Sequence, residues 1–77
     1  METIKELDDW MINKNIKNIF IPNNRSNRYI TDTGEGLEDI YGLYIWYSMD
    51  EKGNRTDIKY FSSEKDAVEF VYKYLLE

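Results

Sequence analysis

The chain is 77 residues long with a formal net charge of −5, which is enough for one domain and too little for two. It contains no cysteine and no histidine, so its own residues cannot supply disulfides or the commonest catalytic and metal-ligating groups. The acidic excess argues against binding to nucleic acid or to an anionic membrane, because that affinity depends on Lys and Arg. Hydrophobic residues form 42% of the sequence, including seven Tyr, three Phe and two Trp, so we expect residues 1–77 to fold as a single domain.

The first predicted element is a helix that begins after Thr3. Thr3 and Glu6 have the spacing of a capping box, in which each side chain accepts a hydrogen bond from the backbone of the other residue. Three apolar residues recur on one side of the helix at helical spacing: Ile4, Leu7 and Met11. The alternating residues 16–21 then predict a short edge strand, because Pro22 cannot donate to a further strand ladder.

The stretch 23–39 is the most loop-like part of the sequence. It contains Asn-Asn at 23–24 and Gly-Glu-Gly at 34–36, and Asn and Gly are the residues that best tolerate turn conformations. The Gly-Glu-Gly run lacks the further glycine and the lysine of a phosphate-binding loop, so we interpret it as a plain turn. A second strand could occupy residues 28–33. The loop carries an acidic cluster: Asp32, Glu35, Glu38 and Asp39.

Residues 41–61 show the clearest pattern in the sequence, a strand and a returning strand joined by a loop at 50–54. Gly53 suits a left-handed position in that loop. Alternation along the first strand gives one face with five side chains: Tyr41, Leu43, Ile45, Tyr47 and Met49. It gives the other face with three: Tyr44, Trp46 and Ser48.

A second helix follows the hairpin, with Ser63 as its N-cap and Asp66 as the partner of that cap. Its apolar residues recur at helical spacing: Ala67, Phe70, Val71, Tyr74 and Leu75. This order of elements predicts an α+β two-layer domain, with a three- or four-stranded antiparallel sheet and the N-terminal and C-terminal helices on one face.

We expect the face with the larger apolar set, together with Tyr60 on the returning strand, to pack against the helices. The opposite face would then expose Tyr44 and Trp46, with Asp57 and Lys59 on the neighbouring strand. Exposed Tyr and Trp are typical anchors of protein interfaces. Two alternatives remain open: these rings pack under the 23–39 loop, or the strand is one residue out of register, which would exchange its two faces.

Enzymatic and metal-binding roles find little support in the residues. A carboxylate site formed by Asp32, Glu35, Glu38 and Asp39 would lack the spacing of an EF-hand loop. We therefore expect a protein that is not an enzyme and needs no cofactor or metal. The acidic N-terminal segment does not resemble a signal peptide, and the apolar stretch 40–49 is too short to cross a bilayer, so we expect a cytoplasmic location.

The carboxy-terminal half carries a resemblance to a known family. It comprises the aromatic strand and charged turn at 44–55, the strand end Ile-Lys-Tyr-Phe at 58–61, and the helix start Ser-Glu-Lys-Asp-Ala at 63–67 with Phe-Val at 70–71. These segments resemble small bacterial immunity proteins of polymorphic and contact-dependent toxin systems. The resemblance covers residues 41–76, and the turn carries Lys52 before its glycine where the family has Arg. It implies a cytoplasmic, non-enzymatic protein that binds one cognate toxin domain and blocks it.

Many toxins of these systems are nucleases with cationic clefts, and an acidic inhibitor complements such a cleft. The resemblance carries over no binding residues, so the predicted partner-binding residues come from charge and strand alternation alone: Asp32, Glu35, Glu38, Asp39, Tyr44, Trp46 and Asp57. Our leading hypothesis is an immunity protein that covers the basic active site of a toxin. The alternative is a phage or mobile-element protein that mimics nucleic acid and inhibits a host defence protein. An edge strand or an aromatic face could equally support a homodimer, so the oligomeric state stays open.

Overall fold

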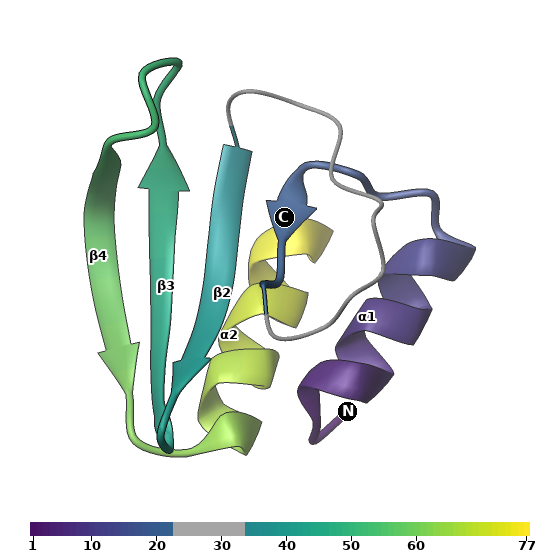
Figure 1. Cartoon of the computed structure of the whole chain (residues 1–77). Helices are drawn as coiled ribbons and strands as arrows, with labels where there is room; N and C mark the ends of the chain where they lie inside the picture. Colours follow the sequence, from purple (N-terminus) through teal and green to yellow (C-terminus); the bar gives the residue numbers. More distant parts are fainter. Residues whose placement is uncertain (23–33) are drawn as a thin grey trace.

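The computed structural model describes residues 1–22 and 34–77 and shows two helices and a four-stranded sheet (Figure 1). In chain order the elements are α1 (Ile4–Asn13), β1 (Ile19–Phe20), β2 (Gly34–Ile40), β3 (Leu43–Met49), β4 (Arg55–Phe61) and α2 (Glu64–Leu76). The strand order is β1-β2-β3-β4, and β1 pairs in parallel with β2 while the other pairs are antiparallel. The strand predicted at 28–33 lies outside the described residues.

Local hydrogen bonds define the start of each helix, as the sequence predicts. At α1 the Glu6 amide donates to Thr3 Oγ1 at 3.1 Å, and the Thr3 amide donates to Glu6 Oε1 at 3.2 Å, which completes the capping box. At α2 the Asp66 amide donates to Ser63 Oγ at 3.1 Å. These bonds satisfy amides that have no partner within their own helix.

The two helices run side by side in the same direction, so their N-termini lie at the same end of the molecule (Figure 1). Parallel helices bring two partial positive charges together, and a carboxylate between them offsets this repulsion. Glu64 supplies it: this residue lies in the first turn of α2, and its Oε2 accepts a hydrogen bond from the Ile4 amide of α1 at 2.8 Å. One side chain thus stabilises both helix starts.

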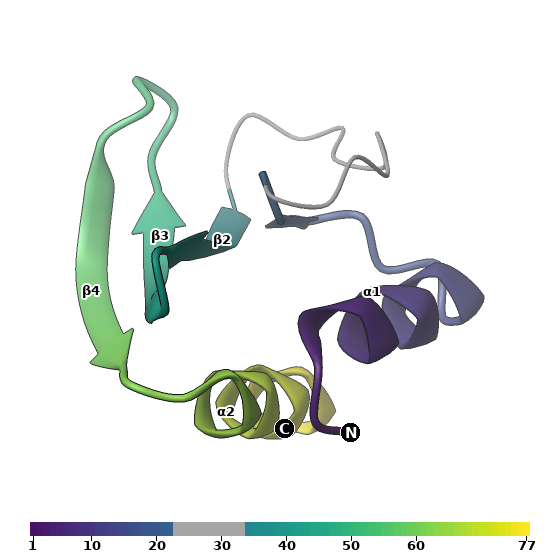
Figure 2. The ribbon, with the colours of Figure 1, turned by 60° about the horizontal axis from the view of Figure 1, so that its bottom comes forward.

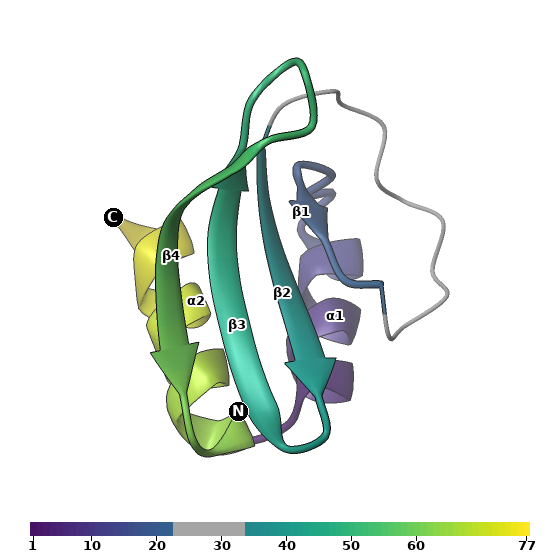
Figure 3. The same cartoon turned by 60° about the vertical axis from the view of Figure 1, so that its left-hand side comes forward.

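Both helices cover the same face of the sheet, which Figure 3 shows from the opposite side. The layer between helices and sheet holds the apolar core: Ile4, Leu7, Met11, Ile19, Ile21, Leu37, Trp46, Ala67, Val68 and Val71. Seen along the sheet, the helices form one layer and the strands the other (Figure 2). The two-layer α+β prediction is confirmed, with one refinement: the parallel β1 makes the sheet mixed rather than wholly antiparallel.

The Gly-Glu-Gly run at 34–36 is the beginning of β2, and its interpretation as a turn is wrong. All seven residues of β2 pair with β3, from Gly34 opposite Met49 to Ile40 opposite Leu43. The connection between them is the two-residue turn Tyr41-Gly42, whose φ angles of 52° and 89° are those of the type I′ turn that joins twisted strands. Tyr41 therefore belongs to a turn and not to a strand.

The two faces of β3 are exchanged relative to the first interpretation. Trp46, expected on the open face, is 3% exposed and lies in the core, with its ring 5.7 Å from that of Phe70 and 5.2 Å from that of Tyr74. Conversely, Leu43 and Tyr60, expected to face the helices, are exposed. The alternative of a one-residue shift is the correct one.

Cross-strand neighbours explain which face of β3 is buried. Trp46 lies opposite Leu37, and Tyr44 lies opposite Phe61 on the other side, so this face has apolar partners. On the opposite face the partners include a glycine and an acidic residue, which offer a core much less apolar surface.

Candidate protein-binding surface

The face of the sheet that turns away from the helices is the candidate functional surface, and we call it the outer face (Figure 3). Strand alternation and the observed pairing assign to it side chains from three strands: Glu38, Ile40, Leu43, Ile45, Tyr47, Arg55, Ile58 and Tyr60. Its chemistry changes along the strands. One half is apolar, and the other is organised around an ion pair.

The apolar half, which we call the apolar patch, consists of five residues: Ile40, Leu43, Ile45, Ile58 and Tyr60. The pairing brings Ile40 opposite Leu43 and Ile45 opposite Tyr60, so the members are neighbours across three strands. Tyr60 is 62% exposed, and Ile58 is 44% exposed. Contiguous exposed apolar side chains on a small protein mark a surface that another molecule can cover.

The other half of the outer face is built on Tyr47 and Arg55. The Tyr47 side chain is fully buried and crosses Gly36 on the neighbouring strand, and the Arg55 guanidinium lies 4.2 Å above its ring. Arg55 also forms an ion pair with Glu38 at 3.3 Å. The ion pair neutralises the charges of Arg55 and Glu38, and the guanidinium above the Tyr47 ring holds that ring in place.

Strand β4 is an edge strand with a bulge at its centre. Asp57 and Ile58 together oppose Tyr47, between the pairs Trp46–Lys59 and Ser48–Thr56. Asp57 adopts a φ of 53°, in the left-handed region that only a few residue types tolerate. This predicted binding residue is exposed at the rim of the outer face, and its bulge interrupts the ladder that another strand would need.

The predicted acidic cluster is distributed over the two faces of β2. Glu38 lies on the outer face, whereas Glu35 and Asp39 share the face of Leu37 toward the helices. The described part of the predicted loop is thus a strand, which separates charges that a loop could have brought together. The fourth member of the cluster, Asp32, lies outside the described residues.

Two of these carboxylates influence tyrosines on the helix side of the sheet. Burial raises the pKa of Tyr74, and the charge of Glu35 and a hydrogen bond with it raise that pKa further. Burial also raises the pKa of half-buried Tyr44, to which the negative charges of Asp39 and Glu64 add. Each effect favours the neutral phenol at neutral pH. Tyr44 packs against the core instead of facing outward, so its predicted exposure is wrong.

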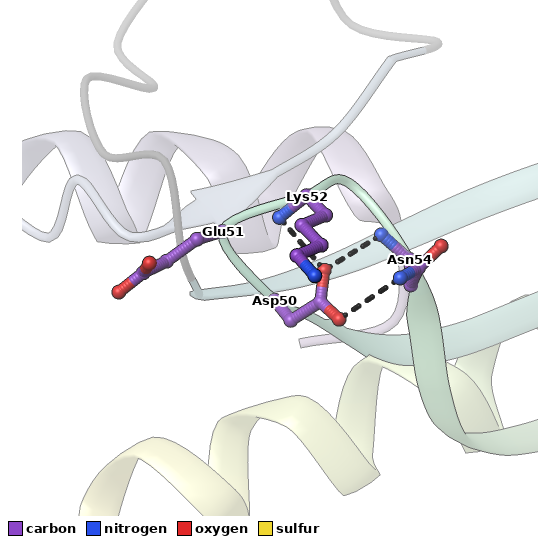
Figure 4. Close-up of a pocket in the computed structure, with 4 residues that line it drawn as sticks. All are labelled: Asp50, Glu51, Lys52 and Asn54. Atoms are coloured by element: carbon purple, nitrogen blue, oxygen red, sulfur yellow. Dashed lines mark hydrogen bonds between the residues drawn. The ribbon is translucent and has the colours of Figure 1, made fainter.

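The β3–β4 loop contains a shallow pocket lined by Asp50, Glu51, Lys52 and Asn54 (Figure 4). Asp50 Oδ1 accepts hydrogen bonds from the Lys52 and Asn54 amides, both at 2.9 Å, and its Oδ2 accepts one from Asn54 Nδ2 at 3.1 Å. These bonds, the one from the Asn54 backbone first, hold the pKa of Asp50 below its usual range. Asp50 therefore organises the turn itself, while Glu51 points away from it (Figure 4).

Residues 1–22 and 34–77 contain no cluster of three acidic side chains arranged to hold a metal ion. Neither of the two helices in this part of the chain has the length and apolarity to cross a membrane. Comparison with protein families, with characterised proteins and with solved structures finds no match.

Sequence reasoning missed the five residues of the apolar patch and also Tyr41, which is 104% exposed at the end of the outer face. For Tyr41 a signal was present in the sequence. The Tyr-Gly pair at 41–42, placed between residues of high strand propensity, was the available signal. A glycine in the second position of a two-residue turn is a known hairpin pattern.

Proposed function

We propose that the chain is an immunity protein that binds a bacterial toxin domain, with a basic nuclease as the expected partner, and blocks its active site. The observation that carries the proposal is the outer face, where neither of the two helices in the described part of the chain covers the apolar patch (Figure 3). A protein of this size gains little by exposing such side chains, unless a partner covers them.

Charge supports the same class of partner. The chain has a net charge of −5, and the rim of the outer face carries exposed acidic residues: Asp50, Glu51 and Asp57. Charges at a rim accelerate the encounter with an oppositely charged protein, while the apolar centre slows dissociation. Residues 41–76, which carry the resemblance to immunity proteins, supply β3, β4 and α2, and thus most of the apolar patch.

A mimic of nucleic acid is less well supported by this geometry. Such a protein presents carboxylates in a row on one surface, spaced like phosphates. Along β2, Glu38 lies on the outer face and is neutralised by Arg55, while Glu35 and Asp39 lie on the other side of the strand. These three carboxylates do not form a row on one surface.

Co-expression with the gene product encoded immediately upstream tests the proposed function. We expect the upstream protein alone to stop bacterial growth and the chain to restore it in the cytoplasm, with a one-to-one complex in gel filtration of the purified proteins. Unrestored growth together with the absence of a complex would contradict the proposal. A complex in which the toxin stays active would show that the chain is an adaptor and not an inhibitor, and would also contradict the proposal.

A further inference from the structure

Tyr41 combines an unfavourable backbone conformation with complete exposure of its side chain. Its φ of 52° lies in the left-handed region, which aromatic residues rarely adopt, and its relative exposure is 104%. Among the residues that the structure describes, none packs on the Tyr41 side chain to compensate for this backbone strain. Asn or Gly at the same position would form the same turn with less strain.

The turn is nevertheless held in a defined geometry. Asp39 Oδ1 accepts a hydrogen bond from the Gly42 amide at 3.0 Å, and the paired residues Ile40 and Leu43 close the turn on either side. A large ring is thus presented on a short connection, next to two members of the apolar patch. A rigid aromatic side chain at the edge of an apolar surface loses little entropy on binding.

We propose that Tyr41 is the anchor residue of the docking surface, inserting into an apolar pocket of a basic protein domain while the apolar patch covers the rim of that pocket. The inference rests on the proposed function and names the residue that determines its affinity. Charge complementarity selects a basic partner, because the chain has a net charge of −5 and the exposed carboxylate of Asp57 lies beside the patch. Strain at a residue without internal contacts is expected where binding requires that residue.

The test uses the full chain and the toxin domain encoded immediately upstream as the probe. In Tyr41→Asn, the midpoint of urea unfolding should be equal to or higher than that of the wild type, because Asn tolerates the left-handed turn. The same variant should raise the dissociation constant by about thirtyfold, the loss typical of a hot-spot residue. Tyr41→Phe keeps the ring and should bind within about threefold of the wild type, as expected for an anchor that acts mainly through apolar area.

Ile12→Ser is the matched control, because Ile12 is 46% exposed but belongs to α1, behind the sheet (Figure 3). It should bind like the wild type. Unchanged affinity of Tyr41→Asn, or a marked loss of its stability, would overturn the role assigned to Tyr41. Lack of wild-type binding would instead overturn the proposed function, and with it the partner named here.

Discussion

Replacement of Gly36 by Ala tests the packing of the outer face. Gly36 lies directly opposite Tyr47, and the aromatic ring occupies the space above the glycine. A Cβ atom at Gly36 would lie 2.6 Å from Tyr47 Cε2 and still closer to Cζ and Oη. The ring has little freedom to withdraw, because it is fully buried and the Arg55 guanidinium lies above it.

Two opposing effects determine the result. In a strand, Ala is ordinarily more stable than Gly by about 0.5–1 kcal/mol. Forcing a methyl group into a filled space costs about 1–3 kcal/mol. The clash should prevail, so we expect Gly36→Ala to lower the free energy of unfolding by about 1–2 kcal/mol. This is a large fraction of the roughly 4–12 kcal/mol expected for a domain of this size.

Urea unfolding followed by Trp fluorescence measures the effect, and Tyr47→Leu provides the matched background. Leu lacks the ring atoms that meet the added methyl group, so in Tyr47→Leu the Gly36→Ala change should be neutral or stabilising. The double-mutant cycle should therefore give a coupling free energy of about 1–3 kcal/mol. Stabilisation by Gly36→Ala alone, or a coupling below about 0.5 kcal/mol, would refute this packing.

Three further predictions concern the core, the helix starts and the pH dependence of stability. Trp46→Ala should lower the free energy of unfolding, measured by urea unfolding, by about 3–5 kcal/mol, and Trp46→Phe should lower it by less. If Trp46→Ala were as stable as the wild type, the burial of Trp46 would be contradicted. Glu64→Gln should cost about 0.5–1 kcal/mol, because it removes the negative charge near both helix starts, and no loss in low salt would contradict this role. Since burial raises the pKa values of Tyr44 and Tyr74, the unfolded chain releases their protons first, so stability should decrease as pH rises above about 10. Urea midpoints at pH 9 and pH 11 measure this, and Tyr74→Phe should reduce the decrease.

The helices were predictable from the sequence because their starts depend on local interactions. The Thr3–Glu6 box and the Ser63 cap require only residues within one turn, and both are present in the structure. The apolar spacing of each helix then identifies its buried side. The apolar residues predicted to be buried in the second helix nevertheless did not include Val68, which is fully buried.

The faces of β3 could not be assigned in the same way, because both carry large apolar residues. Alternation gives two sets of side chains, and only the neighbouring strands decide which set is buried. That information lies in β2, whose glycines at 34 and 36 predicted a turn. Gly36 is required there by the ring of Tyr47, which is a contact between residues 11 positions apart that local sequence patterns do not report.

The sequence predicted the location of the candidate site, an open face of the sheet, but not the residues that form it. An open sheet face opposite the helices was expected and is present, whereas its expected aromatic residues Tyr44 and Trp46 lie on the helix side. Tyr60 and Tyr41 take their place, because the register shift and the turn at 41–42 move them outward. The described part of the expected acidic loop is strand β2, and its pairing with β3 places the acidic side chains on both faces of the sheet.

The outer face, with Tyr41 at its end, is the surface that we propose contacts the partner. Amide chemical shifts of the isotope-labelled chain, recorded during titration with the upstream-encoded toxin domain, test this claim most directly. We predict that the largest shifts occur at the 41–42 turn and at the patch residues of β3 and β4, and that α1 changes little. Shifts confined to α1 and the exposed side of α2, with the turn unchanged, would contradict the claim.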